Sequence, residues 1–285
     1  MPVFTPEYLH KAAYHIYRAK GASEEEAEIV ARHQVKANLV GHDSHGVIHI
    51  PEYVGRIDRG HIVPGAPFVV EKEAPCTAVI NGNWGFGFVV TERAMKMAIA
   101  KAKTNGVAAI TIHYQSHIGR LGDYPTMALE EGMIALVTAD SGAGPKAVVP
   151  FGGKARRLGT NPICIGMPSD LEGPVLMDMA TSAVAAGKIS LARSRKEQVP
   201  PGWIIDKDGN PTTNPDDYPA GEPSCRWART RGIRAMPCPS WWRYSQVCSP
   251  DWVSVWTPRP STTTGCSSAF STWSISGRWT SSNGK

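Results

Sequence analysis

The sequence predicts an α/β protein with three parts. Apolar residues recur at helical spacing in the first forty residues, which predicts an N-terminal helical segment. Strand-like and helix-like stretches then alternate between residues 77 and 138, the order that is typical of α/β domains. The last sixty-odd residues lose this periodicity. We therefore divide the chain into a helical segment (1–75), an α/β domain (76–222) and a tail (223–285).

Three helices are expected in the N-terminal segment. A first amphipathic stripe ends at Gly21, because glycine favours the left-handed conformation that closes helices. Ser23 followed by three glutamates is a capping-box start for a second helix, and the acidic first turn suits the helix dipole. Residues 50–60 predict a third helix. The second helix therefore leads directly into Gly-His-Asp-Ser-His-Gly at residues 41–46.

The α/β domain is expected to alternate between short apolar strands and amphipathic helices, with polar turns between them. Asn105-Gly106 and Gly132 are the stop signals of its two helices. The expected order is strand 77–82, helix 89–102, strand 107–112, helix 124–131, strand 134–138, strand 159–168, strand 175–181, helix 183–195 and a polar loop or hairpin at 205–219.

The tail differs from the rest of the chain in composition. It contains no leucine, yet it holds seven of the nine tryptophans and four of the six cysteines. Natural disorder is depleted in tryptophan, so a linker does not explain it. When Cys225 to Val253 is re-read one nucleotide back with permitted codons, a helical apolar pattern with glycine caps results. We interpret residues 223–285 as an aberrant, frameshifted and poorly ordered tail.

Charge and cysteine usage exclude several classes of protein. The formal charge is +5 overall and +7 in residues 223–285, which leaves −2 for the first 222 residues and argues against a nucleic-acid-binding body. The alternative is a tail that binds nucleic acid through interleaved Arg and Trp at 226–243. The cysteines show no CxxC pair or zinc spacing, and no run of eighteen apolar residues or signal peptide is visible. We expect a reduced, cytoplasmic protein without a metal site, a membrane span or a nucleic-acid partner.

His45 and His117 are the candidates for proton transfer. Imidazole exchanges a proton near neutral pH, because its unperturbed pKa is about 6.5. A single histidine is more often structural, but both of these lie in glycine-bounded polar turns directly after an expected element. Two such turns together favour a catalytic site. His42 and His113 are expected to be structural.

Other polar residues can complete this site. Asp140 follows a strand and can accept the Nδ1 proton of a histidine, although a turn residue is an equally good interpretation. Arg120 can bind a substrate carboxylate through two hydrogen bonds, whereas an isolated arginine is more often a solvated surface group. His49 and Tyr53 lie one and two turns beyond the histidine turn and can line the same pocket. No GxGxxG motif follows a strand, so the usual dinucleotide fingerprint is absent.

Six short stretches in residues 1–222 carry a recognisable pattern. In order, they are Gly41-His42-Asp43-Ser44-His45-Gly46-Val47, Ser116-His117-Ile118-Gly119, Thr138-Ala139-Asp140-Ser141, Pro150-Phe151-Gly152-Gly153, Gly159-Thr160-Asn161-Pro162 and Asp178-Met179-Ala180-Thr181-Ser182. With these stretches the chain resembles the type-2 malate/L-lactate dehydrogenase family, which also includes sulfolactate, ureidoglycolate and diketogulonate oxidoreductases. This resemblance implies an N-terminal helical segment joined to a non-Rossmann NAD(P)-binding α/β domain, and thereby explains the missing fingerprint.

The resemblance implies reversible hydride transfer between NAD or NADP and a small 2-oxo/2-hydroxy acid of the malate, lactate or sulfolactate type. It places His45 and His117 at the acid/base positions. We expect His117 to exchange the hydroxyl proton, and His45 with Ser44 to position or polarise the carbonyl. Family members are typically homodimers with sites near the subunit interface. The stretches that match cofactor-binding segments of the family contain Thr160, Asn161, Pro162, Asp178, Met179, Ala180, Thr181, Ser182 and Lys188.

Two departures from the family keep alternatives open. Many relatives have arginine near the position of His49, where it can bind a substrate carboxylate. The later cofactor contacts of the family fall in the region that the aberrant tail replaces. The alternatives are a ureidoglycolate dehydrogenase or an imine reductase of the same fold, and an inactive truncated fragment.

Overall fold

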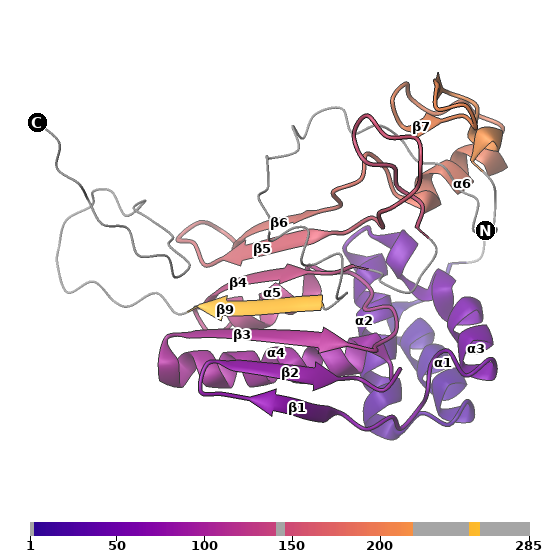
Figure 1. Ribbon diagram of the computed structural model, residues 1–285. Coiled ribbons are helices and arrows are strands. Elements are labelled where there is room, and N and C mark those ends of the chain that lie inside the picture. Colours follow the sequence, from indigo (N-terminus) through magenta and orange to yellow (C-terminus); the bar gives the residue numbers. More distant parts are fainter. Residues whose placement is uncertain (1–2, 141–145, 219–250, 257–285) are drawn as a thin grey trace, which may run out of the picture.

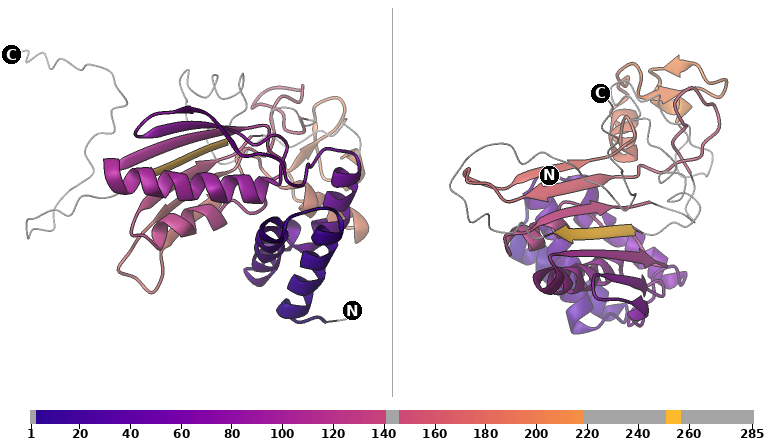
Figure 2. Two further views of the ribbon diagram at one scale, coloured as in Figure 1. Left: turned by 90° about the horizontal axis from the view of Figure 1, so that it is seen from below. Right: turned by 60° about the vertical axis from the view of Figure 1, so that its left-hand side comes forward.

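The computed structural model describes residues 3–140, 146–218 and 251–256 (Figure 1). Its centre is a seven-stranded sheet, and the helices α4 and α5 lie together on one face of that sheet (Figure 2). The N-terminal helices form a second group beside the sheet, and a small group around α6 lies beyond its β5–β6 side. None of the helices that the structure describes is both long and apolar enough to cross a membrane.

The three expected N-terminal helices are present. Ser23 caps the second of them through a complete capping box, in which its hydroxyl accepts from the Glu26 N–H and the Glu26 carboxylate accepts from the Ser23 N–H. Their apolar faces pack on one another and on Phe86 and Phe88 at the start of α4, which joins this group to the sheet domain. The helices are α1 (Pro6–Ala19), α2 (Glu24–Leu39) and α3 (Ile50–Asp58).

The histidine turn is more regular than its sequence suggested. It forms two short 3-10 helices, η1 (Asp43–His45) and η2 (Val47–His49). The Asn38 side chain connects them, because its amide donates to Asp43 (2.6 Å) and its carbonyl accepts from the Val47 N–H (3.0 Å). A Cβ on Gly46 would lie 2.1 Å from the Asn38 Oδ1, so this contact requires glycine.

The sheet has the order β1-β2-β3-β9-β4-β5-β6. The pair β2–β3 is parallel, and every other neighbouring pair is antiparallel. Alternating buried residues of the central strands pack on α4 and α5, which confirms the α/β alternation expected from the sequence. The elements are β1 (Val69–Glu73), β2 (Thr77–Asn81), α4 (Gly87–Asn105), β3 (Val107–His113), α5 (Asp123–Leu129), β4 (Ile134–Thr138), β5 (Ile163–Met167), β6 (Val175–Met179) and β9 (Asp251–Trp256).

The expectation of a poorly ordered tail is wrong for residues 251–256. They form β9, which lies between β3 and β4 in the middle of the sheet. Val253 pairs with Ile110 on one side and Val137 on the other, and both Val253 and Val255 are fully buried. The stretch Trp-Val-Ser-Val-Trp alternates with the period of a strand, but the composition of the whole tail concealed this short signal. Residues 219–250 and 257–285 lie outside the described residues.

A third cluster of buried apolar side chains stabilises the small group of elements around α6, beyond β6. Ile189 and Ile204 are fully buried in it, together with Val199 and Tyr218. The stretch expected to form a polar loop or hairpin contains a short hairpin of β7 and β8. The elements are α6 (Ala186–Ser194), β7 (Ile204–Ile205), β8 (Pro211–Thr212) and η3 (Pro215–Asp217).

Candidate active site

The structure brings the two histidine turns together. The rings of His45 and His117 are stacked, with centroids 5.6 Å apart and an interplanar angle of 24°. His45 ends η1, whereas His117 lies in the loop that follows β3. That loop is fixed against the start of α4, because the Gly87 N–H donates to the Ser116 hydroxyl (2.8 Å) and a Cβ on Gly87 would lie 2.2 Å from the Ser116 carbonyl oxygen. Residues from two parts of the chain therefore form one site.

Tyr53 on α3 orients His117. Its hydroxyl oxygen lies 2.5 Å from Nδ1 of His117, and the backbone N–H of Gly119 donates to the same nitrogen over a long distance of 3.4 Å. The Tyr53 side chain is almost fully buried. Burial raises the pKa of Tyr53 strongly, so this phenol stays protonated over the whole physiological range. The Gly119 N–H can donate only to an unprotonated Nδ1, whereas the Tyr53 hydroxyl can donate to Nδ1 or accept from it. The Nδ1–H tautomer therefore keeps the short contact with Tyr53 and gives up the long one with Gly119.

His49 is held as a cation between two acceptors. Its Nδ1 lies 2.8 Å from the Glu52 carboxylate, and its Nε2 lies 2.6 Å from the Ser44 carbonyl oxygen. Since neither partner can donate, both ring nitrogens must carry a proton to form these hydrogen bonds. The hydrogen bond to Glu52 outweighs burial and raises the pKa of His49 above 6.5. The imidazolium also stacks on Tyr53, at 5.6 Å and 11°.

His45 and His117 are neutral under the same conditions. Burial lowers the pKa of His45 to about 4, and electrostatic repulsion from neighbouring basic groups, among them His49 and Arg120, acts in the same direction. Burial, followed by charge on His45 and His49, also lowers the pKa of His117. His117 keeps an exposed face, so water reduces the cost of placing a charge on its ring. The surroundings still shift the pKa of His117 downward. Two uncharged imidazoles therefore stack beside one imidazolium.

The hydroxyls of Ser44 and Tyr53 contact the Nδ1 atoms of the two histidines, the contact that we expected from the carboxylate of Asp140. The Ser44 Oγ lies 3.1 Å from Nδ1 of the adjacent histidine, and Tyr53 meets Nδ1 of His117. Asp140 instead forms an ion pair with Lys146 at 3.3 Å. The participation of Asp140 in orienting a histidine stays a prediction.

Arg120 is held inside the protein and is not a solvated surface group. Its Nη1 donates to the Asp123 carboxylate at 2.8 Å, and the side chain is 14% exposed. Its charge contributes to the low pKa of His45, so it lies within electrostatic reach of the stacked histidines. Next to it, the Gly122 N–H donates to the Asp178 carboxylate at 2.8 Å. Burial raises the pKa of Asp178, whereas this hydrogen bond and the charge of Arg120 oppose the shift.

The two stretches that match cofactor-binding segments lie side by side. The Thr181 N–H and hydroxyl both donate to the Thr160 carbonyl, and the hydroxyl also donates to the Asn161 carbonyl. Asn161 is buried with a left-handed φ of 39°, a conformation that a non-glycine residue adopts at some cost. Its Oδ1 is buried without a hydrogen-bond partner among the described residues. An unpaired buried acceptor of this kind fits a ligand that donates a hydrogen bond, such as the carboxamide of a nicotinamide.

The remaining candidates of this group lie at the ends of the same elements. Pro162 precedes β5, Met179 ends β6, and Ala180 follows it directly. The buried Ser182 hydroxyl donates to the Val184 carbonyl at 3.1 Å. Lys188 is exposed in the first turn of α6. Binding of a cofactor by these residues stays a prediction.

Sequence reasoning missed a buried ionic cluster of His33, Glu92 and Asp123. The charged side chains are 3%, 5% and 1% exposed. His33 and Glu92 lie on the inward faces of α2 and α4, where the helical period places apolar residues. That interruption of the apolar stripe was the only available signal, because the partners are far apart in the sequence. No group of three or more His, Cys, Asp and Glu residues within the described ranges is arranged to bind a metal ion.

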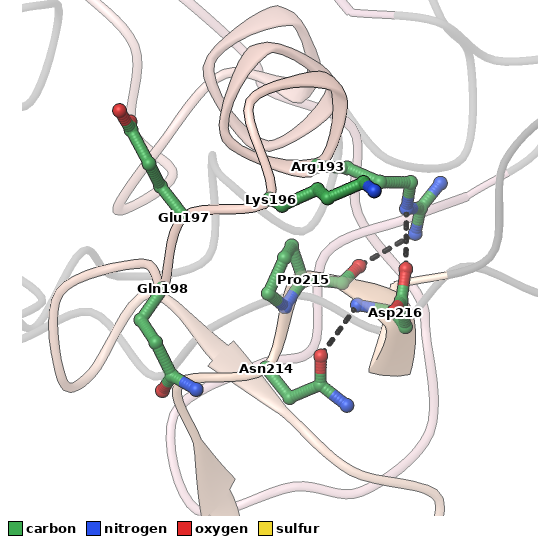
Figure 3. Close-up of a pocket in the computed structure, with 7 residues that line it drawn as sticks. All are labelled: Arg193, Lys196, Glu197, Gln198, Asn214, Pro215 and Asp216. Atoms are coloured by element: carbon green, nitrogen blue, oxygen red, sulfur yellow. Dashed lines mark hydrogen bonds and ion pairs between the residues drawn. The ribbon is translucent and has the colours of Figure 1, made fainter.

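A cavity of about 360 Å³ lies elsewhere, between the end of α6 and η3 (Figure 3). Arg193 closes one side of it by donating to the Pro215 carbonyl (2.5 Å) and pairing with Asp216 (3.2 Å). None of the residues that we expected to be functional lines this cavity. We assign it no role in the chemistry.

Comparison with known proteins finds similar dehydrogenases. Hydroxycarboxylate dehydrogenase B of Escherichia coli K12 is 40% identical over 212 residues, which are 74% of this chain and 58% of that protein. The malate/(S)-sulfolactate dehydrogenase of Methanothermus fervidus is 42% identical over 215 residues, 75% of this chain and 62% of that protein. The chain thus spans about three fifths of the length of these curated relatives.

Solved structures and the family profile cover more of the chain. The structure of a putative malate/lactate dehydrogenase from Escherichia coli matches with a TM-score of 0.79 and 30% identity, over 90% of this chain and 76% of that one. Sulfolactate dehydrogenase from Methanocaldococcus jannaschii matches with a TM-score of 0.76 and 31% identity, over 90% and 78%. The malate/L-lactate dehydrogenase profile matches residues 4–233. The chain belongs to the malate/L-lactate dehydrogenase family.

Proposed function

We propose that this protein transfers a hydride between NAD or NADP and a small 2-oxo/2-hydroxy acid. The observation that carries the proposal is the stacked pair of His45 and His117, in which Tyr53 fixes one nitrogen of His117. Alcohol oxidation requires a neutral base, and the surroundings of both histidines favour the neutral form. The nicotinamide, when bound, supplies the carbon that accepts or returns the hydride.

His117 is the proton acceptor in this proposal. For Nε2 to take the hydroxyl proton of a 2-hydroxy acid, Nδ1 must carry a hydrogen and donate it to the Tyr53 oxygen, so the long contact from the Gly119 N–H is given up in the reacting tautomer. The proton then rests on an imidazolium, and it returns to the oxygen when the 2-oxo acid is reduced. His45, with the Ser44 hydroxyl on its Nδ1, faces the same space and positions the carbonyl oxygen. The hydroxyl proton that leaves the substrate is therefore carried by the imidazole of His117.

Two cations near the stacked pair suit an acidic substrate. His49 is a fixed imidazolium, and Arg120 offers a guanidinium that is only partly used by its carboxylate partner. A planar guanidinium binds a carboxylate through paired hydrogen bonds. The charges of both groups support a carboxylate-bearing substrate of the malate, lactate or sulfolactate type. Relatives of this chain carry the names of malate and sulfolactate dehydrogenases.

A ureidoglycolate dehydrogenase or imine reductase activity is the second candidate within the same fold. A ureidoglycolate dehydrogenase (NAD(+)) of Escherichia coli O157:H7 is 34% identical over 209 residues. A direct assay distinguishes the candidates: the purified chain is incubated with NADH or NADPH and a panel of pyruvate, oxaloacetate, sulfopyruvate and a cyclic imino acid. The hydroxy acids and ureidoglycolate are tested in the oxidative direction. We expect turnover with a 2-oxo acid; turnover with the imine or ureidoglycolate alone would favour the second candidate.

We also propose a homodimer and a cytoplasmic location, both motivated by the family resemblance. Light scattering coupled to size-exclusion chromatography tests the assembly, and fractionation of the source cells tests the location. A mass of about 31 kDa in light scattering would contradict the dimer.

The tail is proposed to result from a frameshift, and its composition supports this idea. The nucleotide sequence around codons 218 to 228 decides it, because an uninterrupted frame in independent DNA would reject the shift. A frame-restored chain is then the control for every activity measurement. If it turns over substrate while the chain with the present tail does not, the present polypeptide is an inactive fragment.

A further inference from the structure

The buried cluster beneath the site has a geometry that a simple packing role does not need. His33 on α2 lies between two carboxylates, with Nε2 3.0 Å from Glu92 on α4 and Nδ1 3.5 Å from Asp123 at the start of α5. Its ring lies against Phe88 and Tyr124, at centroid distances of 5.6 and 5.4 Å. Three ionisable groups thus meet in an apolar layer that joins α2, α4 and α5.

The cluster holds its groups in charged form. Burial alone would lower the pKa of His33, but the carboxylates of Asp123 and Glu92 on either side of the ring outweigh it and raise the pKa. Burial would likewise raise the pKa of Asp123, yet His33 and Lys36 lower it. Burying charges is expensive, and well-packed apolar residues often replace such groups without loss of stability. Stability therefore does not by itself account for these residues.

One end of the cluster reaches Arg120 and, beside it, Asp178 in the stretch predicted to bind the cofactor. Oδ1 of Asp123 accepts from Nη1 of Arg120 at 2.8 Å, while its Oδ2 faces the His33 imidazolium. A Cβ on Gly122 would lie 2.8 Å from Asp178 and 3.0 Å from Nη2 of Arg120, so both side chains close over this glycine. The guanidinium is therefore fixed at one edge by a carboxylate that is itself fixed from behind.

We propose that Asp123, supported by His33, is a positioning residue that orients Arg120 toward an anionic group of a bound ligand. An arginine side chain in solution samples many rotamers, and a buried carboxylate removes most of this freedom before the ligand arrives. Asp123 holds Nη1 of the guanidinium, and Nη2 lies on the side of Gly122 and the Asp178 carboxylate. The anion is the substrate carboxylate or a phosphate of the dinucleotide, and this assignment of the ligand rests on the proposed function.

The positioning claim can be tested without any ligand. In the full chain, the Arg120 Nε–H signal in a ¹H–¹⁵N spectrum is assigned by its loss in Arg120→Lys. We expect Asp123→Asn to shift this signal toward the position of a freely solvated arginine. The matched control is Tyr17→Phe, which breaks the buried hydrogen bond between Tyr17 and Gln34 on α2 and should leave the signal in place. An unchanged signal in Asp123→Asn would overturn the proposal.

The functional consequence is tested by a double-mutant cycle. Asp123→Asn should raise KM for the 2-oxo acid, or the Kd for NADH measured by its fluorescence, by about tenfold, and should change kcat much less. A higher KM for the 2-oxo acid identifies the substrate carboxylate as the anion that Arg120 binds. A higher Kd for NADH identifies the cofactor phosphate. In an Arg120→Gln background, Asp123→Asn should have no further effect, because the group through which it acts is gone.

The outcomes separate the two proposals. If the fold-changes in KM or Kd caused by the two substitutions multiply in the double variant, Asp123 acts independently of Arg120. That result would reject the positioning role. A chain that binds neither NADH, NADPH nor a 2-oxo acid, but shows the expected shift of the arginine signal, would reject the proposed function and leave the positioning role intact. If Asp123→Asn fails to fold, His33→Gln supplies the same two readouts, with a smaller expected shift.

Discussion

The Tyr53 hydroxyl lies 2.5 Å from Nδ1 of His117, across sixty-four positions of sequence. This contact makes the third helix of the N-terminal segment a part of the site in the α/β domain. It also determines which nitrogen of His117 is available to a substrate. If Nδ1 donates to the phenol, Nε2 is the base.

Tyr53→Phe should therefore lower kcat. The substitution removes the oxygen that receives the Nδ1 hydrogen, and leaves a buried polar atom without its partner, a loss of about 1–3 kcal/mol. We expect a decrease in kcat of about tenfold, with little change in the KM for the cofactor. Tyr17→Phe is the matched control, because Tyr17 is equally buried and donates only to Gln34 in the described structure. Equal losses in both variants would indicate a general packing defect.

His117→Ala should lower kcat by roughly a hundredfold or more, the usual contribution of a general acid/base group. The control is His113→Ala at the end of β3, whose ring pairs with Glu71 and stays outside the stacked pair. Steady-state assays of the frame-restored chain in the oxidative direction measure both variants. Near-normal turnover by His117→Ala would remove His117 from the mechanism.

The low pKa of His45 predicts how stability depends on pH. Its folded pKa, about 4, lies below the unfolded value near 6.5, so the unfolded chain binds more protons between these limits. The contribution of this histidine is complete above pH 6.5 and is lost as the pH falls through about 4. Thermal unfolding of the wild type and His45→Asn, measured from pH 7.5 to 4.5, should therefore converge at low pH. Parallel curves would show that His45 has an ordinary pKa in the folded protein.

Much of this fold is predictable because its signals are local. The capping box at Ser23 and Glu26, the glycine stop at Gly106 and the alternating strands all act within a few residues. The two histidine turns were recognisable by the same local chemistry. The pairing of His33 with Glu92 was not, because a charge on the inner face of a helix only indicates that some partner exists. The ion pair of Asp140 with Lys146 was not predictable either, since its position after a strand indicates only that the carboxylate needs a partner.

The place of β9 was the largest failure of prediction, and it leads to a direct test. A strand that pairs with β3 and β4 over sequence separations above one hundred residues leaves no trace in the local pattern of either partner. Val253→Ala removes two methyl groups from the fully buried core and should lower the free energy of unfolding by about 1–3 kcal/mol. Val175→Ala on β6, where the valine is 44% exposed, should cost less than about 0.5 kcal/mol. Urea unfolding of both variants measures the difference. If Val253→Ala is as mild as Val175→Ala, residues 251–256 do not contribute the central strand of the sheet in solution.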